Sequence, residues 1–559
     1  KLVDVWFKLQ LSHHGGKYSI ERLLALDEYT RTTSTWRVLF VCVATPLPMI
    51  ALVLAQECIP LQQPADGWRA NYGLWIRSGI LSAVVTHGMA VHATYMLDGL
   101  ALSLQQLALL TVCVSVGYTA AAMLIAAQWT FPIPFMGISL NFILIVLFAG
   151  WFRLIVGSRI FHQTLSQKRK LLRLIGFVSA QVLMAVIYPA YQVLFDAVTD
   201  VRYVLPVILL LPFIKLIMKN LLSLSITHME DMMPEAVTYT VDFFNALYIS
   251  TCMQSTSSPM NVIAIMAVDF AQTTLELHEL HRSTRGILGR LRQVICTGSD
   301  SGSLLTAVRS LCLNYKILES KGCADIRVAS CLPYRTRIGG KTQPKSSGEI
   351  PHEGPRVSCL EIPLVPPVRI RTLASGCKWA HRVSTTIHPI SIAKLPDSHP
   401  RSPEAQQIGD EVRPTLFQAT QEIGVLRETL EVLYTAECVI LAEYLEFIIP
   451  MVYGCFMLAT VQLPSAQYHT ELANVTRHNV GGTVRSVFIY ALLELASFVI
   501  LAILMQRNCG IRALYHLAFV LETQMSLVQC KQMVWILMTM AFRVVHFGRC
   551  FNQLEWFLY

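Results

Sequence analysis

The sequence predicts an all-α protein, a polytopic helical membrane bundle with a largely disordered cytoplasmic insert. Of its 559 residues, 53% are hydrophobic and only 14% carry a charge, whereas an ordinary soluble domain holds roughly 25% charged residues. The apolar residues also fall in long blocks of about 20 residues, which is the length of a helix that crosses a bilayer. These observations exclude a secreted disulfide scaffold, a disordered protein and a conventional soluble enzyme.

The N-terminal part of the chain predicts a short segment followed by a membrane block. Residues 1–37 are basic and amphipathic, and residues 38–227 contain six blocks long enough to span a bilayer. The six predicted spans are 38–56, 73–97, 107–127, 135–152, 174–194 and 203–222.

Residues 228–297 are harder to interpret because their apolar segments are short. The segments 236–250 and 261–270 are separated by the polar stretch 254–260. Each segment is shorter than a usual span, so either a re-entrant pair or a hairpin fits, adding zero or two crossings. An amphipathic helix is expected to follow at 271–292.

Residues 298–412 form a basic insert, rich in Pro, Ser and Gly, in which no apolar period survives; we expect this insert to be disordered. An amphipathic helix is predicted for 413–437, with Pro414 in its first turn and Arg427 paired with Glu431 at i, i+4. The region 438–559 then predicts two or three spans, at 438–463, 486–506 and 533–547. The whole bundle should therefore have about eight to eleven spans.

The orientation follows from the Lys and Arg residues of the short connections, because positive charge stays cytoplasmic. The first 37 residues contain six Lys or Arg, whereas the connection 57–72 contains Arg69 alone. The N terminus and the 281–413 segment should therefore be cytoplasmic, in a plasma membrane or an endomembrane. Asn474 begins an Asn-Val-Thr glycosylation pattern in a connection that this topology places on the outside.

The net charge of +9 belongs to the insert. Residues 281–413 hold twenty of the 45 basic residues and ten of the 36 acidic ones. Such a segment beside a membrane either binds anionic lipid or a protein partner, or is a solvated linker, which we favour. No aromatic and basic surface for reading nucleic acid is present, so nucleic acid is not an expected partner.

No motif indicates a catalytic, cofactor or metal site. The cysteines and histidines of the insert lack the C-x₂₋₄-C spacing of zinc sites, and the His-Glu-Leu-His run at 278–281 lacks the H-E-x-x-H spacing. We therefore predict no catalytic residue, no cofactor and no metal ligand.

Charged residues inside spans are costly, so each is a candidate functional residue. Arg77 and Lys219 lie near span ends and are expected to reach water, and Asp242 is expected at the interface. The remaining candidates form an intramembrane polar site, which consists of Glu443, Glu446, Glu494, Lys215 and Arg543. From the span limits, Glu446 and Glu494 should differ in depth by about 10 Å, so direct contact is doubtful.

Two hypotheses follow for these residues, and a third class is the least favoured. In the first, the protein is transporter or channel-like, and protons or a cation pass near Glu446 and Glu494. The packing alternative is that each glutamate is protonated or paired with Lys215 or Arg543. The second hypothesis is a non-catalytic receptor or scaffold that uses the basic insert, and an enzyme is third.

Two stretches carry a resemblance to a known group of proteins. One is Lys-Tyr-Ser-Ile-Glu-Arg-Leu-Leu-Ala-Leu-Asp-Glu-Tyr-Thr at 17–30, and the other is Phe-Val-Leu-Glu-Thr-Gln-Met at 519–525, leading to Phe-Arg-Val-Val-His-Phe-Gly at 542–548. They resemble the ends of uncharacterised multi-pass membrane proteins of oomycetes such as Phytophthora. The resemblance covers both membrane blocks but not the insert, and the last eleven residues depart from it. It implies a membrane family and assigns no role to any residue.

Overall fold

The computed structural model describes most of the chain outside the insert. The described residues are 16–198, 201–256, 258–287, 289–290, 304–305, 308–309, 326–332, 403–473, 475–541 and 543–548, with the backbone alone for 403–422. In these ranges the secondary structure is helical, apart from one isolated bridge between His469 and Val544. Eight helices are long and apolar enough to cross a membrane. The predicted all-α polytopic bundle is confirmed, whereas most of the insert lies outside the described residues.

The first membrane pass is built from two helices joined at a proline. Helix α3 (Ile20–Thr32) precedes it, and α4 (Thr35–Ala44) and α5 (Leu47–Glu57) together form the pass. Pro46 is the N-cap residue of α5, so the backbone changes direction there without a clash inside a helix.

Five further helices complete the N-terminal block. They are α6 (Tyr72–Met96), α7 (Leu104–Gln128), α9 (Asn141–Val156), α11 (Lys168–Ala197) and α12 (Val201–Ile226). The short α8 (Met136–Ser139) and α10 (Ser158–Ser166) lie on either side of α9. The predicted span at 135–152 therefore begins later in the structure, at Asn141. Two prolines, Pro206 and Pro212, lie inside α12.

The ambiguous region 228–297 contains two full-length helices. Helix α13 (Met233–Ser255) is buried along nearly its whole length, which is why it can carry more polar residues than a lipid-facing span. Helix α14 (Pro259–Thr284) joins the second apolar segment to the amphipathic stretch that follows it. Neither is a re-entrant half-helix, and by length and composition α14 is a candidate membrane span whereas α13 is not among the candidates.

The C-terminal block is dominated by one helix of 58 residues, α18 (Pro403–Thr460). It begins ten residues before the predicted amphipathic helix and continues into the span at 438–463 without a break, so Pro414 lies inside it rather than in a first turn. Arg427 Nε lies 3.2 Å from Glu431 Oε1, as predicted. Helices α19 (Val480–Cys509), α20 (Ala513–Thr523), α21 (Met525–Ala541) and α22 (Val545–Gly548) follow.

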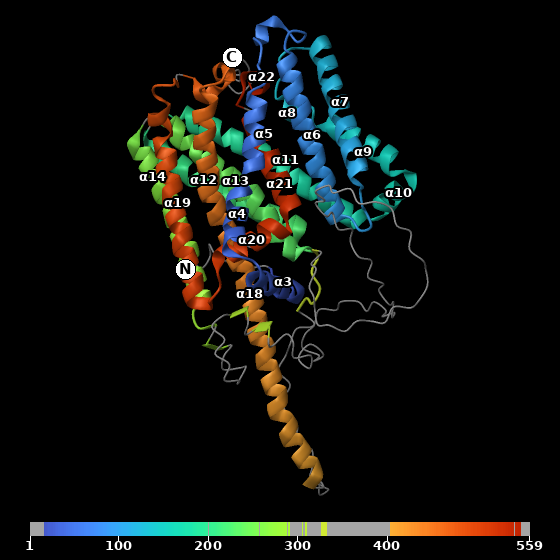
Figure 1. Cartoon of the computed structure of the whole chain (residues 1–559), viewed down its shortest axis with the longest axis vertical. Coiled ribbons are helices and arrows are strands. Elements are labelled where there is room, and N and C mark those ends of the chain that lie inside the picture. The colour runs from blue at the N-terminus through green and yellow to red at the C-terminus, as the bar shows by residue number, and fades with distance from the viewer. Residues whose placement is uncertain are drawn as a thin grey trace.

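We name the two ends of the bundle by their places in Figure 1. The upper end carries α22 and the connection between α18 and α19, and the lower end carries α3, α20 and the part of α18 that extends away from the bundle. Four 3₁₀ turns lie in connections: η1 (Pro64–Asp66), η2 (Glu230–Met232), η4 (Pro464–Tyr468) and η5 (Thr470–Leu472).

Candidate functional site

Five helices bring ionisable side chains together in the interior of the bundle. We call this group the central carboxyl site; it comprises Lys215 and Lys219 of α12, Asp242 of α13, Asp269 and Glu276 of α14, Glu443 and Glu446 of α18, and Glu494 of α19. All eight side chains are buried. The site therefore contains six carboxyl groups and two ammonium groups.

Lys215 contacts two carboxyl groups of the site. Its Nζ lies 2.6 Å from Glu446 Oε1 and 3.2 Å from Asp242 Oδ1. Asp242 Oδ1 also lies 2.9 Å from Lys219 Nζ. Removing one partner from a buried ion pair leaves an uncompensated charge, so these three contacts fix α12, α13 and α18 relative to one another.

A second half of the site is made of acidic groups without a lysine in contact. Tyr490 donates a hydrogen bond of 2.7 Å to Asp269 Oδ2, and the Glu494 carboxyl group lies beside that of Asp269. Two carboxylates this close repel each other, and a proton or a cation between them relieves the repulsion. The Asp269–Glu494 pair is therefore suited to bind a proton or a cation.

Glu443 and Glu494 Oε2 complete this acidic half of the site. Glu443 lies one helical turn before Glu446 on the same face of α18. Neither Glu443 Oε2 nor Glu494 Oε2 has a hydrogen-bond partner among the described residues. Since a buried carboxylate oxygen without a donor is costly, both oxygens are open to a proton or a cation.

The structure corrects the predicted depths of Glu446 and Glu494. Helix α18 ends at Thr460 and α19 begins at Val480, earlier than the predicted spans allow. Both glutamates thus lie roughly four turns from the upper end of their helices. They are at the same level of the bundle, and Glu446 is among the acidic neighbours that surround Glu494.

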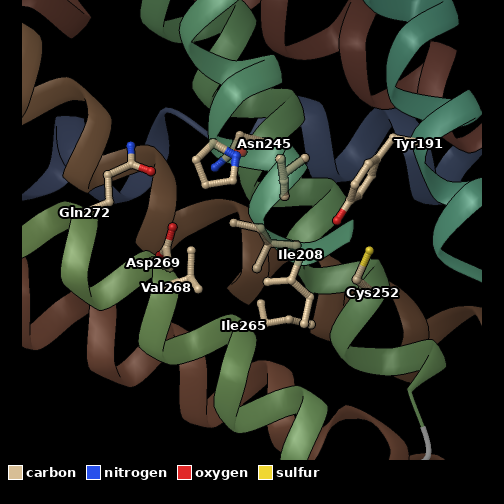
Figure 2. Close-up of a pocket in the computed structure, with 11 residues that line it drawn as sticks. Tyr191, Ile208, Asn245, Cys252, Ile265, Val268, Asp269 and Gln272 are labelled. Carbon is tan, nitrogen blue, oxygen red and sulfur yellow. The ribbon is translucent and has the colours of Figure 1, made fainter. Parts of the chain in front are cut away.

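A small cavity of about 20 Å³ adjoins the site at Asp269 (Figure 2). Asp269 and Gln272 of α14 line one side of it, and Tyr191 of α11 and Cys252 of α13 line the other. A cavity needs roughly 10–15 Å³ to hold one water molecule. The cavity thus has room for a water molecule beside the Asp269 carboxyl group.

Arg543 does not belong to this site, contrary to the prediction. Its guanidinium is ion paired with Glu471 and donates to Thr251 Oγ1 at 2.8 Å, near the upper end. It also stacks 5.5 Å from the ring centroids of Tyr248 and Tyr453. The sequence could not reveal this placement because Arg543 and Glu471 are brought together only when α22 folds back on the 461–479 connection.

Three charged residues expected near water are buried instead. Arg77 is fully buried, and its Nη1 lies 3.1 Å from both carboxylate oxygens of Glu57. Glu57 Oε2 also accepts a hydrogen bond of 2.9 Å from His469 Nε2. Lys219 and Asp242 lie in the central carboxyl site and are buried too. The sequence gives only the depth of each residue along its own span, whereas its burial depends on the neighbouring helices. The predicted exposure of these three side chains was therefore wrong.

Sequence reasoning missed Asp269, Glu276 and Tyr490. Asp269 was placed at the end of a short apolar segment, whereas α14 continues to Thr284 and makes it an interior residue. The available signal was the helical period that carries apolar residues beyond position 270. Tyr490 gave no signal, because a tyrosine within an apolar block is ordinary core.

A separate network joins the N-terminal segment to the lower end of the bundle. Arg22 Nη2 lies 2.5 Å from Glu437 Oε1, and the Tyr18 hydroxyl contacts both Glu437 and His516, the latter at 2.6 Å. Burial, together with the nearby Glu437 carboxylate, raises the pKa of Tyr18 well above its usual value. The hydroxyl group therefore stays protonated and donates a hydrogen bond to Glu437.

Two predicted features lie outside the described residues. They are Asn474, the candidate glycosylation site, and nearly all of the insert that was expected to bind lipid or partners. Of the insert, Arg327 is described, and its Nη2 lies 3.0 Å from Glu230 Oε2 at the lower end.

Comparison of the chain with protein-family models, with curated proteins and with solved structures gives no match.

Proposed function

We propose that the protein is a transporter that moves protons or small cations past the central carboxyl site. The observation that carries this proposal is the imbalance of charge: two lysines face six buried carboxyl groups. Ionisable groups in the middle of a span cost roughly 2.5–3.5 kcal/mol each on insertion scales, so they are rarely kept for packing alone. Lysines neutralise at most two of the six, so protons or cations are expected to balance Asp269, Glu443 and Glu494.

The two halves of the site suit different tasks. In one half, Lys215 is ion paired with Glu446 and Asp242, and these contacts stabilise the bundle. The pairing of Glu446 with Lys215 is the one that the packing alternative predicts. Asp269, Glu494 and Glu443 are the exchangeable half, since protons or a cation must balance them. The path should thus run past Asp269 and Glu494, with Glu446 at its edge.

Proline positions support a path at this level of the bilayer. Pro212 lies one turn before Lys215 in α12, and Pro450 lies one turn after Glu446 in α18. Each proline removes a backbone N–H and frees a carbonyl of the preceding turn. Transporters use such freed carbonyls beside mid-membrane binding sites.

The charge of the connections supports a lower end in the cytoplasm. The connections at the upper end contain few basic residues, namely Arg69, Arg477 and Arg543, and Arg202 lies in the first turn of α12. The lower end includes the basic stretch 168–173, and the basic insert lies in the sequence between the lower ends of α14 and α18. With this orientation the path leads from the outside, through the acidic half of the site, to the cytoplasm.

The proposal is tested with the full-length chain in proteoliposomes that contain a pH-sensitive dye. Under an imposed potential we expect a proton, Na⁺ or K⁺ flux that Glu494→Gln and Asp269→Asn each reduce at least tenfold, and that Glu446→Gln reduces too. Glu428→Gln, on an exposed part of α18, is the matched control and should leave the flux unchanged. Equal flux in wild type, Glu494→Gln and Asp269→Asn would remove the proposal, provided that all variants elute as folded protein.

A further inference from the structure

A larger cavity, of about 80 Å³, lies elsewhere in the bundle, between α6, α9, α11 and α21. It shares no lining residue with the small cavity beside Asp269. An engineered apolar cavity of about 150 Å³ binds benzene. The space therefore suits a group of a few heavy atoms, with any longer part of a ligand lying outside it.

Three residues that line this cavity each carry a buried polar atom without a hydrogen-bond partner among the described residues: His92 Nε2, Gln181 Nε2 and Trp535 Nε1. His92 and Trp535 are only 6% and 3% exposed. Because buried polar atoms are nearly always hydrogen bonded, three of them around one cavity indicate an occupant that satisfies them.

The hydrogen-bonding capacity of the cavity is mixed. His92 Nδ1 lies 2.7 Å from the carbonyl oxygen of Gly88, which can only accept, so Nδ1 carries the proton. In the neutral ring Nε2 is then an acceptor. Trp535 Nε1 is a donor, and Gln181 offers a second donor through its amide nitrogen. A hydroxyl group is the simplest group that donates to His92 and accepts from Trp535 at once.

The charge of the cavity also favours a neutral ligand. Lys531 lines it, but its Nζ lies 2.7 and 2.6 Å from the two carboxylate oxygens of Glu235. Both side chains are buried, so this ion pair is neutral as a unit. An anionic or cationic ligand would enter without a counter-charge, which is costly in a bilayer.

One side of the cavity lining is apolar and only half-buried. It consists of Val85 and Met89 of α6 and Val178 and Val182 of α11, and we call it the mouth of the cavity. All four residues belong to helices that are candidate membrane spans, so we expect access to the cavity from the acyl chains. A ligand would thus come from the bilayer and leave its tail there.

We propose that the cavity between α6, α11 and α21 binds the hydroxyl group of a membrane amphiphile, whose first carbons fill the cavity and whose tail remains in the bilayer. A sterol, a diacylglycerol and a long-chain alcohol all present this chemistry. The site is independent of the central carboxyl site.

The test uses the full-length chain in nanodiscs and a long-chain alcohol that carries a diazirine near its hydroxyl end. We expect photolabelling of peptides from α6 and α11, detected by mass spectrometry. Unlabelled alcohol should compete about tenfold better than its methyl ether, which cannot donate to His92. Competition by cholesterol, by diacylglycerol or by the alcohol alone then identifies the source of the hydroxyl group.

Variants separate recognition from partition into the bilayer. Trp535→Phe keeps a ring but removes the N–H and should weaken competition about tenfold, while Val182→Phe should block labelling by filling the mouth. Trp151→Phe, at a half-buried position outside the cavity, is the matched control and should label as wild type. Labelling that is the same for alcohol and ether, or unchanged in both Trp535→Phe and Val182→Phe, would overturn the proposal and leave water as the occupant.

Discussion

At the scale of single residues, the proposed transport depends on which buried charges are balanced. Lys215 contacts Glu446 and Asp242, and Arg77 contacts Glu57, so these charges are paired within the bundle. Asp269 and Glu494 instead lie beside each other, and Tyr490 donates a hydrogen bond to Asp269. The paired residues hold helices in place, and the unbalanced carboxyl groups are the ones available for proton or cation exchange.

The paired half predicts a large effect on stability. Lys215→Met keeps the length of the side chain but leaves Glu446 and Asp242 without their common partner, so the free energy of unfolding should fall by about 3–5 kcal/mol. Unfolding by sodium dodecyl sulfate in mixed micelles measures this change. Lys170→Met, which removes an exposed pair with Asp98 at the lower end, should cost at most about 1 kcal/mol.

The double variant Lys215→Met/Glu446→Gln gives a further check of the same contact. Because Glu446→Gln removes the carboxylate that has lost its lysine, while Asp242 keeps Lys219, the double variant should be more stable than Lys215→Met alone. If Lys215→Met costs no more than Lys170→Met, the ion pair does not hold the helices as the geometry indicates.

At the scale of helices, α18 organises the bundle because it packs along both α13 and α19. Its part from Ile423 to Thr460, 38 of its 58 residues, is the most buried of the candidate spans. Close approach to α19 occurs at Gly454, where an added Cβ atom would lie 2.7 Å from the ring of Phe488. A Cβ atom there forces the Phe488 ring to move, so glycine lets α18 and α19, which carry Glu446 and Glu494, approach closely.

This packing predicts opposite effects for two glycines of the same helix. Gly454→Ala should destabilise the bundle by about 1–3 kcal/mol, because the Phe488 ring must move. Gly424→Ala has no atom within 4 Å of the new Cβ, and alanine favours a helix by roughly 1 kcal/mol over glycine, so it should be neutral or stabilising. Thermal unfolding in detergent compares the two, and equal melting temperatures would contradict the close approach.

At the scale of the whole molecule, every helix that faces lipid shows apolar residues outward. Val112, Val116 and Leu124 of α7 and Leu492 and Leu493 of α19 are all exposed. In water such surfaces would aggregate, whereas acyl chains solvate them. The basic residues gather at the lower end, which predicts one orientation for the entire bundle.

The orientation is tested with epitope tags inserted after Gly67 and after Gly99. Gly67 lies in an upper connection with no atom within 4 Å of its Cβ position, and Gly99 lies in a lower connection. An antibody should stain the Gly67 tag in intact cells and the Gly99 tag only after permeabilisation, if the protein is at the cell surface. The reverse pattern would invert the proposed path.

The sequence alone determined the class of the protein, the place of most helices and the chemical types at the site. Long apolar blocks suffice for this, because a bilayer allows only helices or closed barrels, and a helix of about 20 apolar residues spans it. Glu446, Glu494 and Lys215 were identified in the same way, since a charge in an apolar block is conspicuous.

Only the tertiary structure decided which charges meet. Asp269 and Glu276 join the central carboxyl site because α14 is a full helix, whereas Arg543 leaves it for Glu471 at the upper end. The cavity beside His92 and Trp535 depends likewise on residues from four helices far apart in the chain. Hydropathy reports the depth of a residue along its own helix, but partners are set by the rotation and spacing of neighbouring helices, which depend on side-chain packing across the whole bundle.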